Sequence, residues 1–189
     1  MPELSDTIQE ATENVKASKL HGRVAIWVAI VATFMALCNV KDDNICQKMS
    51  LAQAKSVDEW SYYQAKSTKE VVVKNALEML AVQKKPEFEP LIARYEQEIR
   101  RYELEKDSIK TRAEGYKKEY DGLNLYDDQF DLTDALLSIA IAIFGITALT
   151  QKKWLFYFAV CISLTGFVMG AAAFMDIRLH SDFISNILG

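Results

Sequence analysis

The sequence predicts an all-α membrane protein with three transmembrane helices and a long antiparallel coiled-coil hairpin inserted between the first and the second. One observation behind this prediction is three runs without a charged side chain, residues 24–40, 135–150 and 154–175. Another is that residues 41–131 hold 16 of the 22 basic and 19 of the 26 acidic residues. This charged region has only two prolines and two glycines, and its composition favours helix.

The N-terminal segment, residues 1–22, is predicted to be a short cytoplasmic amphipathic helix. Its apolar residues recur at helical spacing, and we expect Gly22 to end it. The residues on this stripe are Leu4, Ile8, Ala11 and Val15.

Residues 23–40 predict the first transmembrane helix. Seventeen uncharged residues span about 25 Å as a helix, which suffices for a hydrocarbon core when the flanking Arg23 and Lys41 extend toward the headgroups.

The insert, residues 41–133, is predicted to be a periplasmic helical hairpin with its tip near residues 84–90. The two legs, 41–85 and 90–134, have 45 residues each, so a helix leaving the membrane and one returning would end at the same level. The ascending leg has an irregular apolar stripe. The descending leg has a regular seam, in which Lys106 is the one charged residue. Its members are Ile92, Tyr95, Ile99, Tyr102, Lys106, Ile109, Ala113, Tyr116 and Tyr120.

Two further crossings close the chain. We expect Gly122 and the acidic residues 126–131 to loosen the descending leg before it enters the membrane. Residues 134–150 and 154–175 then predict the second and third transmembrane helices, joined by a cytoplasmic turn at 151–153, and residues 176–189 a periplasmic tail. The basic residues near the N-terminus and in the turn predict that both lie in the cytoplasm.

The sequence argues against several classes of function. The chain has two histidines and three cysteines, and neither residue type forms a metal-binding or nucleophilic motif. We therefore expect that the protein is not an enzyme and binds no metal or cofactor. Basic and acidic residues are interleaved and the net charge is −4, so no nucleic-acid partner is expected. The cysteines are expected to be small packing residues. The alternative for Cys46, just outside the first crossing, is that it meets Cys46 of a second copy in an oligomer.

Small residues lie at helical spacing on all three predicted crossings, which predicts close helix packing, within one chain or between chains. The third crossing carries Gly166 and Gly170 as a G-x-x-x-G pair. The other stripes are Ala25, Ala29, Ala32 and Ala36 on the first crossing, and Ser138, Ala142 and Gly145 on the second.

A short motif follows the first crossing, and it contains Trp60, Tyr62, Tyr63, Gln64 and Lys66. Its pattern, W-x-Y-Y-Q-A-K-x-x-K, resembles a bacterial family of membrane proteins, the domain of unknown function 4337. The order of a crossing, a charged helical insert and two close crossings also resembles that family. The resemblance implies a bacterial inner membrane and carries no activity. From the residues, the aromatic side chains predict either a plug that holds the hairpin base together or a docking site.

These observations lead to a non-enzymatic scaffolding protein of the bacterial inner membrane that self-associates and projects its hairpin into the periplasm. The lipid bilayer and further copies of the chain are its expected partners, and the motif residues together with Gly166 and Gly170 are its expected contact sites. One alternative is an accessory subunit of another membrane enzyme or channel complex. An oligomeric pore ranks lowest, because the polar residues of the crossings are scattered over three helices.

Overall fold

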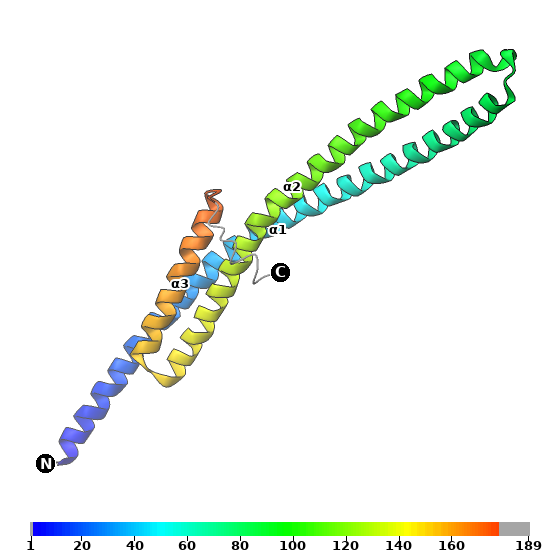
Figure 1. The fold of residues 1–189 in the computed structure, drawn as a ribbon. Helices are drawn as coiled ribbons and strands as arrows, with labels where there is room; N and C mark the ends of the chain where they lie inside the picture. The colour runs from blue at the N-terminus through cyan, green and yellow to red at the C-terminus, as the bar shows by residue number, and fades with distance from the viewer. Residues whose placement is uncertain (1, 178–189) are drawn as a thin grey trace. The chain divides into compact units, whose positions relative to one another are not determined.

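The computed structural model describes residues 2–177, with side-chain surroundings from Lys19 onward. The described residues contain no strand, and the predicted all-α class is confirmed (Figure 1). All three α-helices are long and apolar enough to cross a membrane. The elements are α1 (Pro2–Gln83), the 3₁₀ turn η1 (Pro86–Phe88), α2 (Glu89–Thr150) and α3 (Lys153–Phe174).

Two expected helix breaks are absent. Gly22 lies inside α1, so the N-terminal segment and the first apolar run are one helix. One interior glycine costs about 1 kcal/mol, which a long helix tolerates. Residues 122–131 likewise stay helical within α2, because Gln129 and Phe130 are buried there. The predicted apolar face of the N-terminal segment lies among residues whose side chains the structure does not describe. Residues 178–189 of the expected periplasmic tail also lie outside the described residues.

Short turns join the helices. Lys84, with φ of 49°, and Gln151, with φ of 56°, are in the left-handed conformation that ends many helices. Pro86 opens η1, where its missing N–H costs nothing. The break between α1 and α2 thus falls at residues 84–88, and the break between α2 and α3 at residues 151–152.

The described chain divides into two compact units. The bundle unit comprises Met1–Cys46 and Asn124–Gly189, and the hairpin unit comprises Gln47–Leu123. The bundle unit therefore holds the first part of α1, the last part of α2 and all of α3. The hairpin unit holds the rest of α1 and α2.

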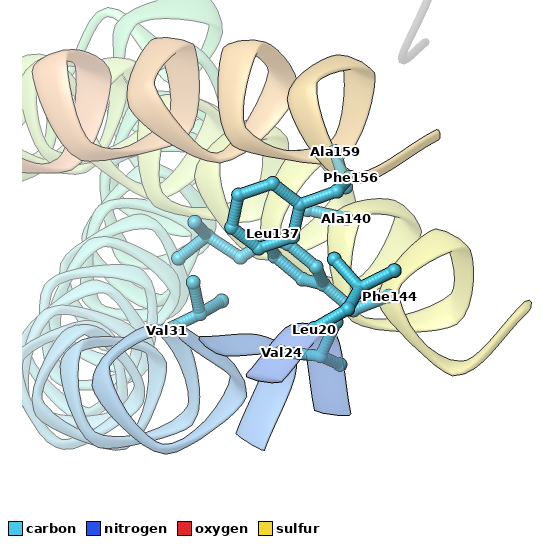
Figure 2. Close-up of a cluster of buried hydrophobic side chains, with 8 residues drawn as sticks. All are labelled: Leu20, Val24, Val31, Leu137, Ala140, Phe144, Phe156 and Ala159. Carbon is cyan, nitrogen blue, oxygen red and sulfur yellow. The ribbon is translucent and has the colours of Figure 1, made fainter. Parts of the chain in front are cut away.

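The bundle unit has an apolar core to which all three helices contribute (Figure 2). Phe144 of α2 packs against Phe156 of α3, with ring centroids 5.8 Å apart. Phe34 of α1 packs against Phe167 of α3 at 4.6 Å. The buried members of this core are Leu20, Val24, Val31, Leu137, Ala140, Phe144, Phe156 and Ala159.

The two glycines of the G-x-x-x-G pair are buried within this core. A Cβ added at Gly166 would come within 2.8 Å of the Leu137 side chain. A Cβ added at Gly170 would meet Phe34 at 2.8 Å and Thr133 at 2.9 Å. The close approach that these glycines permit is therefore between helices of one chain.

The other two small-residue stripes face outward. Every member of the alanine stripe on α1 is exposed, and so are Ser138, Ala142 and Gly145 on α2. The structure thus separates the three stripes, which looked equivalent in the sequence. One stripe packs the bundle, and two remain on its outer surface.

The hairpin unit is an antiparallel pair of helices, because residues late in this part of α1 contact residues early in α2 (Figure 1). Every member of the predicted α2 seam is buried or half-buried, so the seam is confirmed. Tyr102, Ile109 and Ala113 are its most buried residues.

The facing seam on α1 differs from the stripe expected from apolar residues. Spacings of three and four alternate along it without interruption, and each member is buried or half-buried. Three members, Glu59, Lys66 and Glu70, are charged, so a search for apolar residues alone misses this seam. All members of the seam are Met49, Ala52, Ser56, Glu59, Tyr63, Lys66, Glu70, Val73, Leu77 and Leu80.

Candidate functional site

Three charged residues of the α1 seam each meet an opposite charge on α2. Lys66 contacts Glu105 at 2.5 Å. The Arg112 guanidinium donates two hydrogen bonds to the carboxylate of Glu59, at 2.8 and 2.9 Å. The pairs replace apolar contacts along the seam and fix which residues face each other, because a shift of either helix would leave buried charges unpaired.

Glu70 is the most buried of these charges, with 4% of the residue exposed. Its carboxylate contacts Lys106 of α2 and Lys74 of its own helix, the latter at 2.6 Å. Hydrogen bonds from Lys106 and then Lys74 hold the pKa of Glu70 below its ordinary value despite burial. This ion pair explains why Lys106, the one charged residue of the predicted α2 seam, lies in the contact between the legs.

The aromatic motif residues surround these charges. Tyr63 is half-buried, and its ring lies 5.6 Å from the Nζ of Lys106. Tyr62 is 48% exposed, with the Lys66 ammonium 5.2 Å from its ring centre. Trp60 contacts Tyr63 edge to face at 5.6 Å. The motif residues Tyr63 and Lys66 therefore hold the hairpin legs together.

Other motif residues lie outside the contact between the legs. Trp60 and Gln64 are exposed, and they lie on a second line of residues along α1. This line, here called the outer stripe, contains no charged residue, and all its members are exposed. They are Val57, Trp60, Gln64, Thr68, Val71, Asn75, Met79 and Val82, at spacings of three and four.

The bundle unit carries a cluster of acidic groups next to a thiol. Asp42 and Cys46 on α1 face Asp127 on α2, and one ligand atom from each lies within 4.8 Å of the others. The Cys46 thiol donates a hydrogen bond to Oδ1 of Asp127 at 2.9 Å. This bond, more than burial, raises the pKa of Cys46 to about 12, so the thiol is protonated and a weak nucleophile.

Asp42 shares this environment. Burial first, and then the charges of Asp127 and Asp131, raise the pKa of Asp42 to about 7. The Oδ1 of Asp42 is buried and has no hydrogen-bond partner among the described residues. A proton held between Asp42 and Asp127 would satisfy that atom and reduce the repulsion.

This cluster could not be expected from the sequence, because Asp127 is 81 residues from Cys46. Its three donors could approach one cation, but a structural zinc site usually has four ligands, and the thiol would have to lose its proton. The arrangement fits a proton-sharing group better than a metal centre.

A second group of charges lies elsewhere in the bundle unit. Lys19 and Arg23 of α1 and Lys153 at the start of α3 line a cavity of about 180 Å³. From the sequence, these residues indicated the orientation of the chain and, for Arg23, the edge of the first crossing. Their neighbours on other helices are not visible in the chain order.

Together, the fold and these sites define a helical protein with three helices able to span a membrane and a charged two-helix hairpin. The chain belongs to the family described as Domain of unknown function (DUF4337), whose sequence profile matches residues 20–176. The family resemblance, which was inferred from the aromatic motif and the order of segments, is thus confirmed. No curated protein and no solved structure matches the chain.

Proposed function

We propose that this protein is a non-enzymatic scaffold of the bacterial inner membrane that self-associates through the outer stripe and projects its hairpin into the periplasm. The observation that carries this proposal is the stripe itself. It is uncharged and exposed over eight positions, five of which are apolar, whereas the other exposed residues of this part of α1 include Asp58, Lys69 and Glu78. Exposed apolar surface of this kind usually marks a contact surface.

The outer stripe has the spacing of a coiled-coil face. Its two most exposed large apolar side chains lie near the hairpin tip. Met79 is 73% exposed and Val82 80% exposed. At the other end, a groove of about 310 Å³ lies beside Trp60 and Val57 and is bordered by Lys117 and Tyr120 of α2. A second copy would offer the same uncharged stripe, and symmetric pairing would cover both copies.

Membrane insertion is supported by the outer surface of the bundle unit. Large apolar side chains point outward from all three helices, where water would be unfavourable and lipid favourable. Examples are Ile26, Leu37, Ile146, Leu149, Phe158 and Val168, all at least half exposed. The outward stripes of small residues would allow copies to pack closely within the membrane.

The proposed orientation rests on basic residues at one end of the bundle unit. Lys16, Lys19 and Arg23 precede the first apolar run, and Lys152 and Lys153 separate the other two. Placing these residues in the cytoplasm leaves the hairpin in the periplasm. A cysteine introduced by Lys55→Cys should react with a membrane-impermeant thiol reagent added to cells with a permeabilised outer membrane, and one introduced by Lys152→Cys should not. The reverse pattern would contradict the orientation.

A scaffolding role needs no reactive group, and the charges of the hairpin seam and of the acidic cluster have structural explanations. The buried charges of the hairpin unit are paired across the seam. The one reactive side chain near the acidic cluster, Cys46, is held protonated by Asp127. These features favour a structural role over a catalytic one.

The outer stripe provides the test. Val71→Lys places a charge at the centre of the stripe, whereas Leu104→Lys makes the same kind of change at an isolated exposed position on α2. We expect Val71→Lys to lower the mass of the complex in mild detergent and Leu104→Lys to leave it unchanged, with helicity unchanged in both. The masses are measured by light scattering over a range of protein-to-detergent ratios.

Other outcomes discriminate between hypotheses. A wild-type monomer at every ratio would contradict self-association. If foreign chains co-purify and Val71→Lys releases them, the accessory-subunit hypothesis replaces the scaffold, since the same stripe would then bind another protein.

A further inference from the structure

The basic cavity of the bundle unit lies where the start of α3 approaches α1. Leu20 and Phe156, which form its apolar floor, belong to the end of the buried cluster seen in Figure 2. Its volume of about 180 Å³ is below the roughly 300–1,000 Å³ typical of pockets that enclose a whole small molecule. It suits a headgroup better than a complete ligand. Its lining residues are Lys19, Leu20, Arg23, Lys153, Phe156 and Tyr157.

The cavity has a strong preference for an anion. Three of its six lining residues are cations and none is acidic. Within the described part of the chain, Lys19, Arg23 and Lys153 form no ion pair. Three unpaired cations around one concave surface raise the local positive potential, which an anion would lower.

The N-terminus of α3 adds to this potential. Lys153 is the first residue of α3, and the preceding Lys152 makes no side-chain capping bond. The amide N–H of Leu155 already donates to the carbonyl oxygen of Lys152 at 3.2 Å, which leaves the amides of Lys153 and Trp154 for an acceptor, and the helix dipole favours negative charge there. Tyr157, one turn further along, brings a phenol hydroxyl that can donate to the same anion.

An apolar groove follows the basic cavity along the same two helices. It has a volume of about 410 Å³, and its lining is almost entirely hydrocarbon. Arg23 of the cavity and Ile30 of the groove are seven residues apart on α1, about 10 Å along the helix axis. The groove is lined by Ala29, Ile30, Thr33, Phe34, Leu37 and Phe167.

We propose that this pair of features is a binding site for an anionic phospholipid, whose phosphate occupies the basic cavity and whose acyl chain lies in the groove. The inference rests on the membrane insertion proposed above, because only then does an acyl chain run along α1 and α3. A free phosphate would leave the groove empty. An acidic peptide would have to bury backbone polar groups against its hydrocarbon lining.

The test uses the full-length protein in mild detergent, with bound lipids counted by native mass spectrometry. Phosphatidylglycerol is compared with phosphatidylcholine of the same acyl chains, so that headgroup charge is the difference. Wild type should retain phosphatidylglycerol preferentially. Arg23→Gln and Lys153→Gln should each reduce that preference about fivefold, the effect of removing one cation from an anionic lipid site.

Lys152→Gln is the matched control, since Lys152 adjoins Lys153 but does not line the cavity. It should retain most of the preference. Equal losses from Lys152→Gln and Lys153→Gln would overturn the proposal, because they would indicate general attraction to positive charge. The substituted side chains are exposed, and unchanged circular dichroism would verify that each variant is folded.

Soluble competitors distinguish the sources of the phosphate. Inorganic phosphate and glycerol 3-phosphate should displace little phosphatidylglycerol, because neither fills the groove. Displacement at concentrations similar to those of the lipid would assign the cavity to a free phosphate and overturn the lipid proposal, as would displacement by an acidic peptide. If wild type shows no headgroup preference yet remains membrane-bound and oligomeric, this inference fails alone. If the chain is extracted from membranes by alkaline carbonate, the proposed function fails with it.

Discussion

Removing the charge of Glu70 should destabilise the hairpin unit more than removing any exposed charge. Glu70→Gln keeps the size of the side chain but leaves Lys106, whose side chain is 17% exposed, without its anionic partner. Breaking a fully buried ion pair costs about 3–5 kcal/mol and breaking an exposed one about 0.2–1 kcal/mol. Because a two-helix hairpin shields this pair from water on some sides only, we expect a loss of about 1–3 kcal/mol.

The pair also makes a prediction about compensation. Replacing both partners in Glu70→Leu with Lys106→Leu removes the unpaired charge and adds apolar contact, so the double variant should recover the stability lost in Glu70→Gln. Unfolding of the full-length protein by urea in mild detergent, followed by circular dichroism, measures both effects, since helices within the detergent micelle stay folded.

The direction of the pH dependence gives an independent check. The pKa of Glu70 lies below its ordinary value in the folded protein, so its contribution is present above the pKa of the unfolded chain. It should be lost as the pH falls through the lower, folded value, and Glu70→Gln should lack that loss. A change of less than about 0.5 kcal/mol on Glu70→Gln, as for an ordinary surface position, would refute the assignment of Glu70 as a buried, paired charge.

Three further predictions concern the bundle unit. Gly170→Ala should lower the stability by about 1–3 kcal/mol by overpacking. Gly145→Ala, with open space around it, should leave the stability unchanged or raise it by up to about 1 kcal/mol, because alanine favours helix over glycine. Thermal unfolding measures both effects, and equal effects would contradict the packing of α3. Because the folded pKa of Asp42 is raised from 3.8 to about 7, the bundle should lose stability as the pH rises between those values, and Asp42→Asn should flatten this profile of thermal midpoint against pH. Cys46 should react slowly with alkylating reagents at neutral pH, and Asp127→Asn should accelerate the reaction roughly tenfold or more, measured by mass spectrometry; an unchanged rate would remove Asp127 as the cause of the raised thiol pKa.

The features that the sequence determined are those with a local, repetitive physical cause. Charge-free runs and helix-favouring composition predicted the three long helices. The break at 84–88 follows from Pro86 and its polar neighbours, and the break at 151–152 from the polar residues between two apolar runs. The α2 seam was predictable because all but one of its members are uncharged at regular spacing. Helix ends were less predictable, since Gly22 is a local signal that a long apolar continuation overrides.

The features that only the tertiary structure decided depend on which helix faces which. Glu59, Lys66 and Glu70 resemble solvent-exposed charges in the sequence until α2 supplies their partners. The α1 seam therefore could not be found from apolar residues alone, and the uncharged outer stripe lies outside the contact between the legs. Three stripes of small residues had the same signature. Among the described residues, Gly166 and Gly170 of α3 lie against bulky side chains, whereas the members of the other two stripes are exposed. A pattern along one helix shows that a face can pack, but contact energy depends on the partner's shape and charge, which a distant segment provides.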